Sequence, residues 1–534
     1  MMETSVVNVA VKSASYNIIL QILMRIVSSL SNAVILRFIA KDALGVINVR
    51  LMLLYSTCHC ITREAFRRSC LSKFNSRTVQ NKFNLLWLTL PTCVLCSIVL
   101  GYIWLYLLDK PDPVVVPNYT AGVNIVLVSV FIETLSEPLF VFSQSFHFVK
   151  LKVIIEGVML SAKSIAMVIF LSKWPDHAMF SFCLSQALGS VIYTLSYYVY
   201  FSWYLSVNKS ILPVRHIKDI LPKFSKQFVD WEDYCLTWSF FKQTFLKQLL
   251  TEGERYLMTF FTILSFGEQG LYDVVNNLGS LAARFLFLPI EESGYLLFTQ
   301  LINRDQPIHA QKNLTLSLSL LENLLKLMVL LGLMILTFGY SYSQLLLLLY
   351  GGPILSTGKA LTLMRWHCAY VFLLAINGIT ECFKFAVMNH YQVNRYNKKM
   401  IMLSVIFLVA AYCFVHLFGG VGFILANCLN MGFRIIHSIF YIHRYFKMPR
   451  FWLVKNVIPH SAVTTVLCLT FVLTSISEVF LCCNYGIQFW IWHLLLGIGC
   501  FTLFIWAVWC NEYMLVRFLS EQWRKKDFKI NKVL

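Results

Sequence analysis

Several arginines stand inside or at the ends of apolar stretches, where a charged side chain is costly and usually serves a purpose. Arg284 and Arg434 lie near the middle of such stretches with no acid beside them, whereas Arg37 and Arg63 end two others. A guanidinium group binds two phosphate oxygens at once, so arginines at several depths suit the passage of a phosphorylated anion. We predict that they line one cationic cavity, and its candidate ligands are Arg25, Arg37, Arg63, Arg67, Arg284 and Arg434.

Carboxylates occupy similar apolar stretches and admit two roles. An acid within the membrane can gate a transport path or bind a coupling ion. Alternatively, it pairs with one of the arginines and only stabilises the fold. For Glu322 and Lys326, an i,i+4 pair in the favourable order, we expect the structural role. The candidate gating or coupling residues are Glu137, Glu252, Glu254, Asp273, Glu291 and Glu292.

Motifs of common enzymes and metal sites are missing. The string from Gly352 to Lys359 has the wrong spacing for a phosphate-binding loop and carries Ala after the Lys. No H-E-x-x-H or G-x-S-x-G occurs. Cys93 and Cys96 lie in an apolar run, where cysteine is most often a small hydrophobic residue. We predict no enzyme activity, cofactor or metal, and we assign no pairing to the vicinal residues Cys482 and Cys483.

The whole chain is too apolar for a soluble protein. Of its 534 residues 58% are hydrophobic and 13% are charged, whereas soluble domains carry about 25% charge. Apolar runs of about twenty residues indicate membrane helices rather than the short alternating segments of a β-barrel. We predict an all-α polytopic protein with fourteen spans, at about 16–38, 44–62, 84–107, 120–142, 153–172, 178–205, 246–266, 269–300, 315–339, 361–383, 400–418, 420–442, 456–480 and 487–512.

Positive charge is distributed unequally between the two sides of these spans. With both termini in the cytosol, the cytosolic segments hold 32 Lys and Arg and the lumenal segments hold five. This bias is typical of cytosolic loops and supports the N-in, C-in orientation. It also explains the net charge of +19 without nucleic acid binding. The N-glycosylation sequon at Asn118 then faces the lumen close to the next span, while the sequons at Asn208 and Asn313 face the cytosol.

A short pattern recurs at an offset of six spans. Ile132–Glu137 and Ile376–Glu381 both read I-x-x-(L/I)-(S/T)-E, and Gly45 and Gly270 stand near the start of spans two and eight. The pattern predicts a duplicated six-helix unit, with the cationic cavity between two lobes as in many transporters. The predicted parts are an N-lobe at 1–206 (helices 1–6), a basic cytosolic linker at 207–245, a C-lobe at 246–446 (helices 7–12), and helices 13–14 with a basic tail at 447–534.

Several segments together resemble the Rft-type family of Man5GlcNAc2-PP-dolichol translocation proteins, within the multidrug/oligosaccharidyl-lipid/polysaccharide exporter superfamily. They are Asn48–Thr57, Arg63–Cys70, Leu250–Tyr256, Tyr272–Ser280, Pro289–Ser293 and Asn377–Cys382. The resemblance implies a two-lobed fold of twelve helices plus two, an endoplasmic reticulum location and a role in N-glycan precursor assembly. It implies dolichol pyrophosphate-linked oligosaccharide and membrane lipid as partners.

The expected function is ATP-independent translocation of this glycolipid from the cytosolic to the lumenal leaflet. The cavity would hold the charged headgroup while the tail stays in lipid, because charge crosses hydrocarbon only at high cost. Two alternatives stay open. One is an ion-coupled exporter of another substrate, with Glu133, Glu137 or Asp273 as coupling sites. The other is a non-transporting accessory protein of the dolichol pathway.

Overall fold

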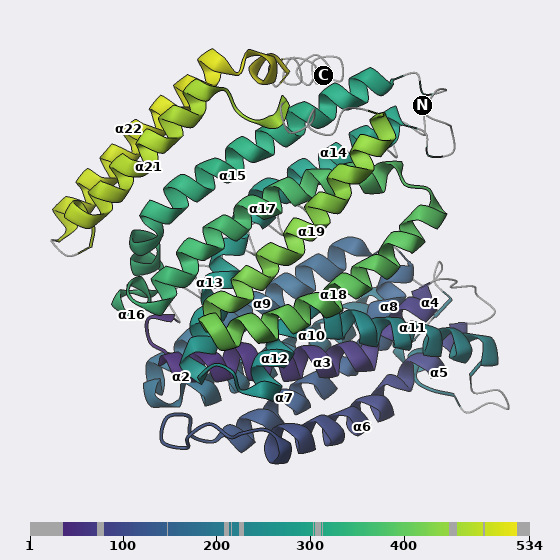
Figure 1. Cartoon of the computed structure of the whole chain (residues 1–534). Helices are drawn as coiled ribbons and strands as arrows, with labels where there is room; N and C mark the ends of the chain where they lie inside the picture. The colour runs from purple at the N-terminus through teal and green to yellow at the C-terminus, as the bar shows by residue number, and fades with distance from the viewer. Residues whose placement is uncertain are drawn as a thin grey trace. The chain divides into compact units, whose positions relative to one another are not determined.

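The chain is a helical membrane protein. A computed structural model describes residues 36–71, 79–146, 148–207, 213–214, 216–223, 229–302, 304, 311, 313–447, 456–483, 486–518 and 520. Every regular element in these ranges is a helix (Figure 1). Ten helices are long and apolar enough to cross a membrane, and the bent pair Tyr119–Thr134 and Glu137–Ser145 makes an eleventh span.

These eleven agree with predicted spans two to six and nine to fourteen. Most of predicted span one, including Arg25, lies outside the described residues. Predicted spans seven and eight are helical but are not among the eleven, because they are less apolar or interrupted. The total of fourteen helices and the orientation of the termini therefore stay predictions.

The chain forms two compact units, Met1–Gly270 and Leu271–Leu534. The first unit contains α2 (Lys41–Gly45), η1 (Val46–Leu51), α3 (Met52–His59), η2 (Cys60–Glu64), α4 (Ala65–Leu71), α5 (Val79–Trp87), α6 (Thr89–Tyr102), η3 (Ile103–Leu107), α7 (Tyr119–Thr134), α8 (Glu137–Ser145), α9 (Val149–Lys173), η4 (Pro175–His177), α10 (Ala178–Val207), η5 (Ile217–Ile220), α11 (Trp231–Thr251) and α12 (Gly253–Phe261). Helices α11 and α12 thus belong to this unit, whereas the sequence pattern assigned span seven to the second lobe.

The second unit begins at Leu271, within α13. It contains most of α13 (Phe266–Ala282), then η6 (Ala283–Phe287), α14 (Leu288–Leu301), α15 (Leu314–Gly351), α16 (Pro353–Ser356), α17 (Lys359–Val387), α18 (His390–Phe418), α19 (Gly420–Phe446), α21 (Ser461–Leu481) and α22 (Ile487–Asn511). In Figure 1, α15, α17, α19 and α18 lie side by side in that order. Apolar side chains of α14, α15, α17 and α19 form a core that includes Met328, Ala375 and Phe383.

Two glycines in the first unit allow the start of α13 to touch α2. A Cβ atom on Gly45 would lie 1.8 Å from the carbonyl oxygen of Phe266, and one on Gly270 would lie 2.7 Å from the nitrogen of Gly45. Neither position has room for a larger residue, since the backbones themselves are in contact. The two glycines that matched in the sequence repeat therefore pack against each other.

A bend between α7 and α8 separates the acids Glu133 and Glu137. The helices meet at 43°, and Pro138 stands in the first turn of α8. Proline has no N–H to bond back into the preceding turn, so one helix ends and another begins there. The predicted span at 120–142 is therefore present as a bent pair of helices, and the proline is the physical reason for the bend.

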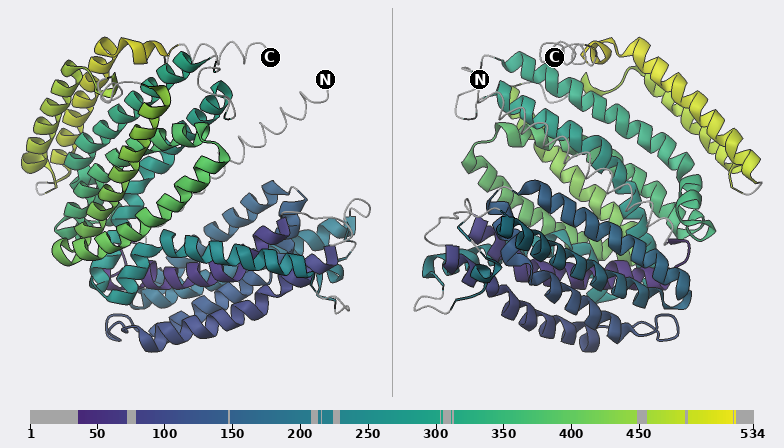
Figure 2. Two further views of the ribbon diagram at one scale, coloured as in Figure 1. Left: turned by 45° about the vertical axis from the view of Figure 1, so that its right-hand side comes forward. Right: turned by 180° about the vertical axis from the view of Figure 1, so that it is seen from behind.

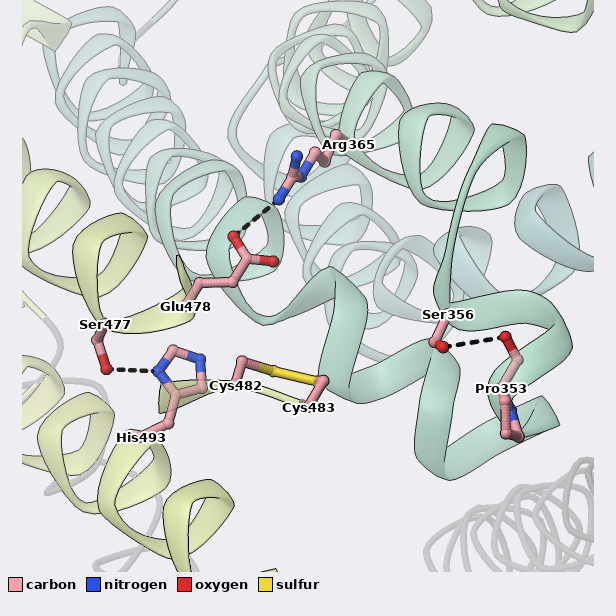
Figure 3. The surroundings of a disulfide bond; sticks show 8 residues. All are labelled: Pro353, Ser356, Arg365, Ser477, Glu478, Cys482, Cys483 and His493. Atoms are coloured by element: carbon pink, nitrogen blue, oxygen red, sulfur yellow. Dashed lines mark hydrogen bonds and ion pairs between the residues drawn. A yellow bond between two sulfur atoms is a disulfide. The ribbon is translucent and has the colours of Figure 1, made fainter. Parts of the chain in front are cut away.

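The α21–α22 hairpin is attached to the rest of the second unit near both of its ends. Near the hairpin turn, Arg365 Nη2 donates to Glu478 Oε2 at 2.8 Å and Ser477 Oγ lies 2.7 Å from His493 Nδ1 (Figure 3). The same turn contains a disulfide between Cys482 and Cys483, to which the sequence analysis had assigned no pairing. Both views in Figure 2 show the hairpin running beside α15.

At the other end of the hairpin, α15 supplies a basic and an acidic partner. Lys326 forms an ion pair with Glu512, which also accepts the backbone N–H of His460 at 2.7 Å. Glu322 Oε1 accepts from Asn456 Nδ2 at 2.5 Å. The expected i,i+4 pairing of Glu322 with Lys326 is therefore wrong, because each residue finds a partner from the C-terminal segment.

Candidate functional site

An ion cluster at the junction of α4, α7 and α8 has Glu137 at its centre. Arg67 donates from Nε and Nη2 to the two carboxylate oxygens, each at 2.7 Å, and Arg63 Nη1 lies 2.8 Å from Oε1. Glu137 is fully buried and Arg63 is 3% exposed. A carboxylate with two arginines is well compensated, and removing Glu137 would take this partner from both arginines at once. The structure thus places Arg63 and Arg67 in the pairing arrangement that was the alternative to substrate binding.

Glu133, one turn earlier on α7, is held by different groups. Tyr55 Oη donates to its oxygens at 2.8 and 2.9 Å, and Ser190 Oγ donates at 2.7 Å. His59 Nε2 lies 3.4 Å away and Arg63 Nη1 lies 3.6 Å away. Hydroxyl groups therefore supply the close contacts, unlike the guanidinium groups around Glu137. Sequence reasoning missed Tyr55 and Ser190, because neutral residues in apolar runs give no signal by themselves.

The second unit contains a corresponding cluster around Glu381 on α17. Arg434 on α19 donates from Nε to Oε1 at 3.1 Å and forms a second bond from Nη2 to Oε2. Tyr396 Oη donates to Oε1, and Asn377 Nδ2 donates to Oε2 at 3.2 Å. Arg434 is therefore paired within its own unit.

Lys384 completes this second cluster and corrects a prediction. Its Nζ lies 3.7 Å from the carboxylate of Glu381, donates to Ser438 Oγ at 2.8 Å, and sits 3.5 Å from the centre of the Tyr396 ring. The topology count placed Lys384 in a cytosolic segment, but it is fully buried on α17. Its position three residues after an intramembrane glutamate was the available signal.

The two clusters follow the internal repeat in part. Glu137 and Glu381 end the matching hexapeptides, and both are buried acids in ion pairs. Ser190 stands 53 residues after Glu137, and Arg434 stands 53 residues after Glu381. Both of these residues reach back to an acid of the matching helix, Ser190 to Glu133 and Arg434 to Glu381. The acid is repeated, whereas its cation comes from α4 in one unit and α19 in the other.

Arg284 differs from these paired arginines. It lies in the π-helical turn η6 and is exposed, and the described residues offer it neither a hydrogen bond nor an ion pair. π-Helical turns inside longer helices are frequent at functional sites. Arg37, just before α2, is also exposed. Among the predicted ligands that the structure describes, Arg284 is thus a cation available to an external anion.

The remaining predicted acids are distributed over several helices. Asp273 is buried on α13 and accepts from Asn277 Nδ2 at 2.9 Å. Glu252 pairs with Arg255 at 3.0 Å, beside Glu254 at the junction of α11 and α12. Glu291 lies against Gly378, where an added Cβ would be 1.8 Å from its Oε1. Glu292 is exposed. Their predicted gating or coupling role stays a prediction.

Asn118, the sequon residue, is exposed and caps the start of α7. Its backbone is in the left-handed region with φ of 62°, which asparagine tolerates better than most residues. The sequon therefore directly adjoins a span, as the sequence indicated.

A separate cavity of about 860 Å³ lies between α15, α17 and α21. Its walls are largely apolar, with Leu336, Trp366 and Phe471 among them, and Arg365 contributes the charged group. The predicted site residues do not line this cavity. It is therefore distinct from the ion clusters.

Residues 9–522 match the family model described as Rft protein. The chain is 44% identical to "Man(5)GlcNAc(2)-PP-dolichol translocation protein RFT1" of Xenopus tropicalis over 517 residues, covering 96% of both chains. The Mus musculus protein of the same name is 44% identical over 521 residues, again with 96% of each covered. The Drosophila melanogaster protein of that name is 38% identical over 483 residues, covering 83% of this chain and 86% of that one.

The fold is similar to a solved structure, "Lipid II flippase MurJ, inward closed conformation". The TM-score is 0.62, the sequence identity is 12%, and the match covers 92% of this chain and 97% of the other. At this identity the likeness shows a shared fold.

Proposed function

The chain belongs to the Rft protein family, and from this premise we propose that it helps to translocate Man5GlcNAc2-PP-dolichol from the cytosolic to the lumenal leaflet of the endoplasmic reticulum membrane. The observation that carries the proposal is the 44% identity, over 96% of both chains, to relatives named for this translocation. The MurJ-like fold is consistent with it. The protein is then a transporter, with no hydrolytic step of its own.

The chemistry of the substrate explains what such a protein must supply. A diphosphate with a large sugar headgroup crosses hydrocarbon only if polar groups replace its water. The polyprenyl tail needs no such help, since lipid surrounds it throughout. The sequence has no phosphate-binding loop for ATP, so we propose that net movement follows consumption of the substrate in the lumen.

We propose Arg284 as the principal ligand of the diphosphate. Its guanidinium group is exposed on a helix within the protein, and no acid of the described residues neutralises it. Arg37 is proposed as a further ligand, together with Arg25, which lies outside the described residues. Arg63, Arg67 and Arg434 could contact the substrate only if their ion pairs opened, so we assign them a secondary part.

Purified protein in liposomes containing authentic Man5GlcNAc2-PP-dolichol tests the proposal. We expect the glycolipid to change leaflet without an ion gradient. Arg284→Ala should slow this movement tenfold to a hundredfold, because each charge-assisted hydrogen bond is worth about 1.5–3 kcal/mol. Arg284→Lys keeps the charge but loses the two-pronged geometry, so it should restore only part of the rate.

Three outcomes would contradict this account. Movement that requires a proton or sodium gradient would favour an ion-coupled exporter, for which Glu133 with its hydroxyl ligands is the best coupling candidate. No movement in any condition would favour an accessory protein. Normal movement by Arg284→Ala at wild-type abundance would show that Arg284 is not a ligand.

A further inference from the structure

Helix α11 runs antiparallel to the span Lys41–Leu71 and lies at the same depth. Thr237 Oγ1 donates to Ser69 Oγ at 2.8 Å near one end of that span. Gln248 Nε2 lies 3.5 Å from Ser56 Oγ near its middle. The sequence pattern placed most of this segment in a cytosolic connector, but the structure sets it beside the membrane helix α4 and the turn η2 (Figure 1).

Two of the faces of α11 have a clear role. Thr237 and Thr244 are buried where the helix packs on its neighbours. A second face carries stacked aromatic rings, with Trp238 and Phe241 at 5.4 Å and Phe241 and Phe245 at 6.5 Å between ring centres. Trp238 and Phe245 are each 51% exposed. Such a face suits contact with lipid.

A third face is polar, and we name it the polar stripe: Ser239, Gln243, Lys247 and Thr251. These side chains are four residues apart, so they follow one another along the helix. All four are exposed and have no hydrogen-bonding partner among the described residues. An amide or an ammonium group is costly in hydrocarbon, so at membrane depth we expect Gln243 and Lys247 to face water or a polar ligand. The stripe therefore borders an aqueous space.

We infer that the polar stripe binds the saccharide part of the transported glycolipid, an inference that rests on the proposed function. Two hydroxyls and an amide offer donors and acceptors of the kind that sugar hydroxyls need. The stripe carries no carboxylate, which would repel the diphosphate, and its one charge is the cation of Lys247. The twelve steps of 1.5 Å from Ser239 to Thr251 give a length of about 18 Å, enough for several sugar rings.

A binding experiment can separate the sugar from the diphosphate. Purified full-length protein would be titrated with dolichyl diphosphate carrying Man5GlcNAc2 and with dolichyl diphosphate carrying one GlcNAc. We expect the wild type to prefer the larger headgroup. Gln243→Leu should reduce that preference about tenfold while leaving affinity for the smaller one unchanged. Lys242→Met on the aromatic face is the matched control and should keep the wild-type preference.

The outcomes distinguish this inference from the proposed function. A wild type that binds both lipids equally overturns the saccharide role and leaves translocation intact. A wild type that binds neither overturns the proposed function and the inference together. Equal losses for both lipids in Gln243→Leu would show that the stripe contacts the diphosphate, which also overturns the inference.

Thiol labelling tests the exposure of the polar stripe to water without relying on affinity. With the exposed cysteines Cys235, Cys413, Cys468 and Cys510 replaced by alanine, a membrane-impermeant maleimide should label Gln243→Cys and leave Phe245→Cys unmodified. Man5GlcNAc2-PP-dolichol should then slow labelling at position 243 at least several-fold. Labelling of Phe245→Cys with none of Gln243→Cys, or labelling that the glycolipid does not slow, would refute the assignment.

Discussion

Replacing Arg434 with alanine should cost stability before it costs any transport step. The change removes two hydrogen bonds to the buried carboxylate of Glu381 and leaves that acid with Tyr396, Asn377 and Lys384. Breaking a buried ion pair from one side typically costs about 3–5 kcal/mol. Because three groups still contact Glu381, we expect the lower end, about 3 kcal/mol.

Arg284→Ala is the internal control for this prediction. In the sequence, both Arg284 and Arg434 are arginines near the middle of a predicted span. In the structure, Arg434 forms an ion pair with Glu381, whereas Arg284 has no ion-pair partner among the described residues. Removing an exposed side chain without a partner usually changes stability by less than about 0.5 kcal/mol. Arg284→Ala should therefore keep normal abundance while Arg434→Ala loses much of it.

The assay is thermal unfolding of detergent-purified protein, with membrane abundance measured in parallel. A double-mutant cycle with Glu381→Gln should give a coupling energy of about 2 kcal/mol, within the range for residues in direct contact. A coupling energy near zero, or an Arg434→Ala protein as stable as the wild type, would refute the reasoning that this ion pair holds α17 to α19.

Three further predictions address other parts of the chain. Gly45→Ala should destabilise the protein by about 1–3 kcal/mol because its Cβ would meet backbone, whereas Gly432→Ala, with open space around it, should be neutral by the same unfolding assay. Glu512→Gln removes the ion-pair partner of Lys326 on α15 and should speed proteolysis at the C-terminal end of α22 several-fold. Unchanged cleavage would show that this ion pair does not hold α22 to α15. If any sequon carries glycan it should be Asn118, and a mobility shift lost in Asn313→Gln would contradict the predicted orientation.

Hydropathy was sufficient for the spans whose surfaces meet lipid. Eleven predicted spans have matching helices because apolar length alone is what a bilayer requires. Helix α11 does not meet the criterion of apolar length. Its polar stripe lowers its mean hydropathy, and its buried face contains threonines such as Thr237. Contact with a neighbouring helix, which no single-sequence window records, puts it at membrane depth.

The sequence could indicate that membrane acids and bases form ion pairs, but not which residues pair with each other. The sequence analysis offered pairing of intramembrane acids and bases as the alternative to a substrate cavity, and Arg63 and Glu137 do pair. Which side chains meet depends on helix rotation and on bends such as the one at Pro138, which a hydropathy pattern does not contain. For the same reason Lys384 was assigned to a loop although it is buried.

If the predicted repeat reflects a gene duplication, the unequal clusters around Glu137 and Glu381 bear on how the two copies diverged. A buried acid is difficult to lose, because its removal strands the arginines that surround it. A second cation on another helix, however, can take over before the first disappears, and at no stage is the acid unpaired. The descendants then share the glutamate and differ in the origin of its arginine, α4 in one half and α19 in the other. A search for common ancestry between the two halves should therefore weight acids above bases, because here the glutamate is repeated and its arginine is not.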